Sequence, residues 1–169
     1  THNLPKEIQE ITTDTSDGVE LTSLYLASSQ SDKLVIYFHG NAGNIYHRIP
    51  SLLQLHRLGV SVIGVSYRGY GKSQGSPSEQ GIYLDGEAIF QYSINNLGFA
   101  EENIIILGRS IGSTVAVNTA RNRSLGGIIL VTPLTSAKEL AKARGLDFLS
   151  SLAGDSFDNL SKMADIRSP

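Results

Sequence analysis

The 169-residue chain carries 14 Lys and Arg against 16 Asp and Glu, a formal net charge of −2, and no cysteine. This length fits one domain, 1–169, that buries a core without disulfide or metal staples. The charge excludes a nucleic-acid binder that works by bulk electrostatics, and no stretch approaches the roughly 18 apolar residues of a membrane span.

The first predicted elements are a hairpin and a buried strand. Residues 7–14 and 19–27 alternate apolar and polar side chains on either side of a turn at 16–18, a pattern typical of two antiparallel strands. The apolar run at 33–39 indicates a strand that is buried on both faces. A glycine-rich loop at 40–43 follows this strand.

Helix and strand patterns then alternate along the chain. In order, they predict a helix at 45–58, a strand at 60–66, a helix from Ser78 to about Leu97, a strand at 103–108, a helix at 111–122 and a strand at 127–131. Residues 132–169 contain two weak helical patterns and no strand. The alternation predicts an α/β fold with a mostly parallel sheet behind an N-terminal antiparallel hairpin.

The sharpest motif is G-x-S-x-G at 108–112, between a predicted strand and a predicted helix. A nucleophile at such a turn adopts a strained backbone, and Cβ atoms two residues to either side would collide. Gly108 and Gly112 remove that collision and lift the Ser110 hydroxyl clear of the sheet. The helix that begins at Ile111 directs unpaired N–H groups toward the site. The alternative is a structural turn with a capping serine.

A second motif, His39-Gly-Asn-Ala-Gly43, closes the earlier buried strand. Acyl transfer needs two preorganised donors near the developing oxyanion. Glycines such as Gly40 let the backbone approach, so the N–H groups of Asn41 and Ile111 are the predicted pair; a plain turn is the alternative. We expect His39 to brace this loop by hydrogen bonding rather than to act as a base.

The glycine spacing in the segment after the second buried strand does not match either of two nucleotide-binding motifs. Gly71-Lys72-Ser73 imitates the end of a phosphate-binding loop, but that motif requires a glycine where Ser66 stands. Gly69-Tyr-Gly71 does not extend to G-x-G-x-x-G, because position 74 is Gln74. No metal site and no organic cofactor are expected.

Three ordered motifs together resemble the α/β-hydrolase superfamily, in particular its serine aminopeptidase-like branch with depalmitoylase-like members. They are the segments at 39–43, 67–79 and 108–112, and the loop at 132–136 is also similar. The resemblance implies Ser110 as nucleophile, an oxyanion hole from the backbone N–H groups of Asn41 and Ile111, and hydrolysis of an ester, thioester or amide through an acyl-enzyme.

The chain departs from this family after the nucleophile. The family order is Ser, then an acid, then His, but no histidine follows Ser110. Residues 160–169 resemble the lead-in to the first of two further strands. We therefore expect a C-terminally truncated hydrolase that lacks the last two βα units and has little turnover by itself. The strand at 128–131 would then be an apolar, unpaired edge prone to self-association.

Several features leave alternatives open. A non-catalytic, hydrolase-like binding or scaffold protein would have the same sheet and the same turns. A small-molecule acyl substrate is expected, with apolar residues of 137–152 either lining its pocket or packing on the sheet.

Arg68 and Arg109 could hold an anion, but a salt bridge to Asp85 or a solvated position is expected. Because the chain opens with Thr1, cytoplasmic localisation and anchoring through a removed N-terminal segment both stay open.

Overall fold

The computed structural model describes residues 3–40, 43–136, 138 and 157–169, and all structural statements concern these residues. Their strands are β1 (Gln9–Asp14), β2 (Glu20–Leu26), β3 (Leu34–Phe38), β4 (Ser61–Val65), β5 (Ile104–Arg109) and β6 (Gly127–Val131). Their helices are α1 (Ile49–His56), α2 (Glu79–Asn95), α3 (Ile111–Ala120) and α6 (Asn159–Lys162), with short 3-10 turns at Ile45–Arg48, Glu101–Asn103 and Met163–Asp165.

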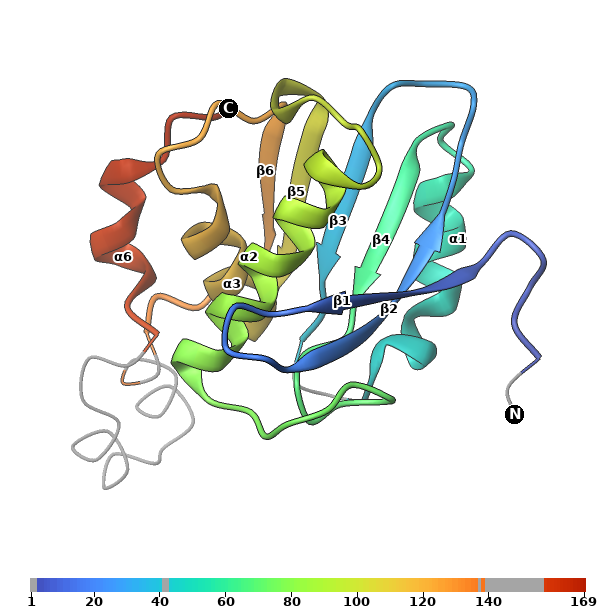
Figure 1. Cartoon of the computed structure of the whole chain (residues 1–169). Coiled ribbons are helices and arrows are strands. Elements are labelled where there is room, and N and C mark those ends of the chain that lie inside the picture. Colours follow the sequence, from blue (N-terminus) through green and yellow to red (C-terminus); the bar gives the residue numbers. More distant parts are fainter. Residues whose placement is uncertain (1–2, 41–42, 137, 139–156) are drawn as a thin grey trace.

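The six strands form one mixed sheet in the order β1-β2-β4-β3-β5-β6 (Figure 1). β1 pairs with β2 and β2 with β4 in antiparallel fashion, whereas β3 is parallel to both β4 and β5, and β5 is parallel to β6. The predicted α/β fold, a mostly parallel sheet preceded by an antiparallel hairpin, is confirmed.

Helices cover both faces of this sheet (Figure 1). On β3, Leu34, Ile36 and Phe38 belong to the core cluster that includes side chains of α2 and α3. Tyr37 belongs to a second cluster with Leu52 of α1. Since successive strand side chains point to opposite faces, the apolar run of β3 supplies both cores at once.

The predicted helix boundaries hold with local adjustments. The 45–58 pattern divides into a 3-10 turn and α1, and Pro50 lies in the first turn of α1, where its missing N–H is not needed. Ser78 caps α2 by accepting a hydrogen bond at its Oγ from the Gly81 N–H, at 3.0 Å. Of the two weak patterns in 132–169, the second gives α6, and the first lies largely outside the described residues.

β6 forms one edge of the sheet, as predicted, with Ile129 48% and Val131 38% exposed. The expectation that the edge is unpaired is wrong at one position, because the Ile128 N–H donates to the Pro169 carbonyl at 2.9 Å. The chain returns to this edge after α6: the Asn122 N–H donates to the Asp165 carbonyl, and the Leu125 N–H to Ser168 Oγ. Among the described residues, the start of β6 is therefore covered by the C-terminal segment, whereas Ile129 and Val131 at its end are exposed.

Within the described ranges, no helix is both long and apolar enough to cross a membrane.

Candidate active site

Ser110 lies between the end of β5 and the start of α3, with φ 53° and ψ −121°. A positive φ is strained for a residue with a side chain and persists only where neighbours fix it. The Ser110 N–H donates to the Val131 carbonyl at 3.0 Å, and the Ser110 carbonyl accepts from the N–H and Oγ of Ser113 at 2.9 and 2.6 Å. The half-buried Ser110 side chain does not cap α3. Its hydroxyl is thus held at the turn without a role in helix capping.

The glycines on either side of Ser110 pack against backbone. A Cβ on Gly112 would collide with the Phe38 carbonyl and lie 2.7 Å from the His39 oxygen. A Cβ on Gly108 would lie 2.6 Å from that of Ala116. Glycine at both places lets the turn press against the end of β3 and the first turns of α3.

The loop after β3 passes next to Ser110. A Cβ on Gly40 would lie 3.4 Å from both the Ser110 Cβ and the Arg109 carbonyl oxygen. Ile111 is the first residue of α3, so its N–H has no partner within the helix. The other predicted oxyanion donor, Asn41, lies outside the described residues.

His39 is fully buried at the end of β3, against this loop. Its Nδ1 is 2.6 Å from the Gly40 carbonyl oxygen, and because a carbonyl only accepts, Nδ1 carries the proton. The Tyr67 hydroxyl donates to the His39 carbonyl at 2.8 Å, and the two rings lie 4.6 Å apart. The His39 side chain therefore hydrogen-bonds to the first residue of the loop.

Burial lowers the pKa of His39, and the nearby Arg48 charge acts in the same direction. The unfolded chain, whose histidines titrate near pH 6.5, then binds more protons than the folded chain as the pH falls. We expect the free energy of unfolding to be fully retained above about pH 6.5 and to decrease below it. His39→Gln should flatten this dependence in urea denaturation measured across pH. His47→Gln, at an exposed position, is the control, and an equal pH dependence in both variants would contradict the assignment.

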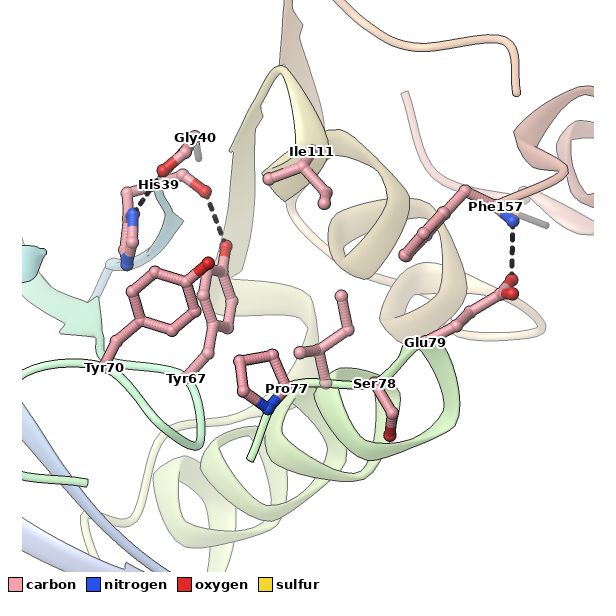
Figure 2. A pocket seen from close by; sticks show the side chains of 10 residues that line it. His39, Gly40, Tyr67, Tyr70, Pro77, Ser78, Glu79, Ile111 and Phe157 are labelled. Carbon is pink, nitrogen blue, oxygen red and sulfur yellow. Dashed lines mark hydrogen bonds between the residues drawn. The ribbon is translucent and has the colours of Figure 1, made fainter. Parts of the chain in front are cut away.

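A cavity of about 270 Å³ opens against Gly40 and against Ile111, the residue that follows Ser110 (Figure 2). It is lined by His39, Gly40, Tyr67, Tyr70, Pro77, Ser78, Glu79, Ile82, Ile111 and Phe157. Figure 2 shows the two tyrosines on the His39 side, and Phe157 on the opposite side. Ile111, the residue after Ser110, joins the two sides. The cavity thus places an apolar chamber next to a strained serine.

Sequence patterns did not identify most of this lining. The apolar residues of 137–152, proposed as one possible wall, lie almost entirely outside the described residues. Tyr67 and Tyr70 belong to the 67–79 motif, whose glycine spacing resembles phosphate-binding loops and does not by itself indicate an apolar wall. The sequence signal that could have identified this wall was the pairing of turn glycines with neighbouring aromatic residues in that motif.

The two arginines near the site have different positions. The Arg68 Nε donates to Asp85 Oδ1 at 2.8 Å, which confirms the expected salt bridge. Arg109 is exposed and lines a separate groove beside α1 and β6. Within the described residues, no group of three or more His, Asp or Glu side chains is placed to hold a metal ion.

Comparison with known proteins identifies the family to which the chain belongs. A family model described as alpha/beta hydrolase fold matches residues 33–160. Protein bem46 of Schizosaccharomyces pombe is 37% identical over 140 residues, which cover 79% of this chain and 47% of that protein. Human alpha/beta hydrolase domain-containing protein 17B is 32% identical over 159 residues, 93% of this chain and 54% of that protein.

Solved structures agree on the fold. An alpha-beta hydrolase from Vibrio vulnificus superposes with a TM-score of 0.85 at 25% identity, over 96% of this chain and 61% of that one. The Pyrococcus furiosus esterase Pf2001 superposes with a TM-score of 0.82 at 22% identity, over 100% of this chain and 72% of that one. The chain spans about half the length of the curated relatives it matches, such as 47% of bem46.

Proposed function

The chain belongs to the alpha/beta hydrolase fold family, and we propose that it is a serine hydrolase. The reaction is cleavage of an ester, thioester or amide through an acyl-enzyme on Ser110. One observation carries the proposal: Ser110 is held at a positive φ between β5 and α3, and an apolar cavity opens beside it.

The proposed chemistry begins with attack of Ser110 Oγ on the substrate carbonyl. The hydroxyl proton goes to a base, and the negative charge that develops on the carbonyl oxygen is stabilised by the N–H of Ile111 and, as the second donor, that of Asn41. Collapse of the intermediate expels the leaving group and leaves the acyl group on Ser110, from which water removes it. Gly108 and Gly112 support the turn, and His39 and Gly40 support the oxyanion loop.

His39 is unsuited to be the base. Its side chain is fully buried and its protonated Nδ1 is bonded to Gly40. No histidine follows Ser110 within the 169 residues, whereas the family's base comes after the nucleophile. Of the histidines that the structure describes, the one beside the oxyanion loop is therefore not the proton acceptor of the proposed reaction.

We therefore expect weak esterase activity from the 169-residue chain itself. Without its base, a serine hydrolase keeps a residual rate about 10³–10⁴ above that of water. Hydrolysis of p-nitrophenyl acetate should stay within that limit, with Ser124→Ala, an exposed serine away from the cavity, as the control for Ser110→Ala. Fast turnover that depends on Ser110 would show that a base is already present.

The lack of a histidine after Ser110 also favours a second function, a hydrolase-like binding or scaffold protein. It would use the same cavity to hold a small molecule without cleaving it. The two functions differ in one observable property, because only the hydrolase forms a covalent acyl adduct on Ser110 when a base is supplied.

We also propose that the open end of β6 pairs two copies of the chain. Ile129 and Val131 are exposed on an edge strand, and such edges pair readily with other strands. Sedimentation should show association that increases with concentration and is weakened by Ile129→Lys. Leu160→Lys, at an exposed position on α6, should have no effect. A chain that stays monomeric at high concentration would refute this pairing.

A further inference from the structure

The cavity beside Ser110 has room for a hydrocarbon chain of limited length. Its volume is about 270 Å³. A cavity of roughly 150 Å³ holds benzene, which corresponds to about 25 Å³ per carbon. By this measure the cavity holds about ten carbons.

The cavity walls suit hydrocarbon rather than a polar chain. Tyr67, Tyr70, Pro77, Ile82 and Ile111 present rings and aliphatic groups. Two of the polar lining residues have partners in the protein. The Ser78 hydroxyl accepts from the Gly81 N–H at 3.0 Å, and the Tyr67 hydroxyl donates to the His39 carbonyl at 2.8 Å. Burial of each methylene of a guest is then expected to raise its affinity about fourfold.

Phe157 closes the side of the cavity opposite Gly40 (Figure 2). Its backbone N–H donates to Glu79 Oε1 at 2.7 Å, and the Tyr83 hydroxyl donates to the same oxygen at 3.0 Å. The Phe157 ring contacts that of Tyr83 edge to face, with centroids 6.5 Å apart. The wall is therefore fixed by a hydrogen bond and a ring contact together.

A longer guest would meet two barriers at this wall. It would have to displace the Phe157 ring, and it would be pressed further against the Glu79 carboxylate that lines the cavity, whose Oε1 already accepts two hydrogen bonds. Bringing hydrocarbon against a carboxylate removes water from the charge at a large cost. Chain length is thus limited by shape and by charge at the same place.

We propose that this cavity is the acyl site and takes straight-chain acyl groups of up to about ten carbons, with Phe157, held by Glu79, setting the limit. The assignment rests on the proposed function for its chemistry, but occupancy of the cavity needs no reaction. Glu79 acts here as a positioning residue, through Phe157.

Binding of sodium alkanoates, the product acids of the proposed reaction, tests the assignment by isothermal titration calorimetry. From butanoate upward, affinity should increase about fourfold per methylene and level off near ten carbons, well before hexadecanoate. Affinity that is independent of chain length, or that continues to increase through hexadecanoate, would overturn the proposal.

Variants at the wall make the test specific. Phe157→Ala removes a ring of benzene size and should extend the limit by roughly six carbons, whereas Phe157→Trp should shorten it. Glu79→Gln removes the charge and should weaken the exclusion of long chains. Phe99→Ala, the same exchange at a position outside the cavity, should leave the limit unchanged. A limit that stays the same in both Phe157 variants would refute the role of this residue.

The outcomes separate the acyl site from the reaction. Length-dependent alkanoate binding without any acylation of Ser110 would support the assignment of the cavity as a site for acyl chains and would refute the proposed hydrolase function. Acylation of Ser110 without length-dependent binding would support the hydrolase function and would refute the assignment of the cavity as the acyl site.

Discussion

Asp85→Ala is expected to lower the free energy of unfolding by about 3 kcal/mol, the lower end of the cost of breaking a buried ion pair, because it leaves the buried Arg68 with only the half-exposed Asp17 as counter-charge. Asp85 is 0% exposed and the Arg68 side chain 7% exposed. Asp85 accepts from Arg68 twice, at 2.8 Å each, from the side-chain Nε and from the backbone N–H. The alanine variant would leave both donors without this acceptor.

Arg68 also joins parts of the chain that lie far apart. Its terminal nitrogens donate to both oxygens of Asp17 in the hairpin turn, at 2.7 and 2.9 Å. It follows Tyr67 in the chain and precedes Tyr70, the two aromatic walls of the cavity. Loss of the Asp85 partner should therefore loosen the cavity as well as the fold.

Urea denaturation measures the loss of stability in Asp85→Ala, and two further variants show whether the loss comes from the broken ion pair. Asp85→Leu with Arg68→Met removes both charges and should recover most of the lost stability, since a buried pair is replaceable by apolar side chains. Asp17→Ala removes a half-exposed partner and should cost less. If Asp85→Ala unfolded at the same urea concentration as the parent chain, the ion pair would not be needed for stability.

Gly112→Ala should lower the free energy of unfolding by about 3 kcal/mol, the upper end of the usual cost of overpacking. The added Cβ meets the carbonyls of Phe38 and His39, which are backbone atoms that cannot rotate away. Relief requires a shift of α3 away from the end of β3. That shift would separate Ile111 from Gly40 and should weaken alkanoate binding.

Gly127→Ala is the matched control for Gly112→Ala. Among the described residues, a Cβ at Gly127 meets the Pro169 oxygen alone, at an ordinary 3.5 Å, and the φ of Gly127 is not positive. Denaturation should show little change for this variant. Equal stability of the two alanine variants would mean that the tight contact at Gly112 has no energetic importance.

Much of the fold was predictable because the central strands of the sheet appear in the sequence as continuous apolar segments. β3 and β4 are five-residue strands in which every residue is buried, and their patterns needed no knowledge of the partner strand. The turn at Ser110 was predictable for a local reason, since glycines two residues to either side meet the same crowded backbone.

The cavity was not predictable in the same way. Tyr67, Ile82 and Phe157 come from a loop, a helix and the segment before α6, and only tertiary packing brings them together. The bond from Ile128 to Pro169 had the same origin, because it depends on the path of the chain after α6 and not on any local pattern. Long-range contacts of this kind have no signature in a single sequence.

The central claim, that Ser110 is a nucleophile whose base is not assembled around it, has a direct test. The chain is incubated with p-nitrophenyl acetate with and without added imidazole as an external base, and its intact mass is measured by mass spectrometry. Both Ser110→Ala and Ser124→Ala are compared with the parent chain.

We expect an adduct of one acetyl group on the parent chain and on Ser124→Ala that accumulates much faster with imidazole, and none on Ser110→Ala. Peptide mapping should place the acetyl group on Ser110. If p-nitrophenyl acetate with imidazole acetylated the parent chain and Ser110→Ala equally, or acetylated neither, Ser110 would not be a nucleophile.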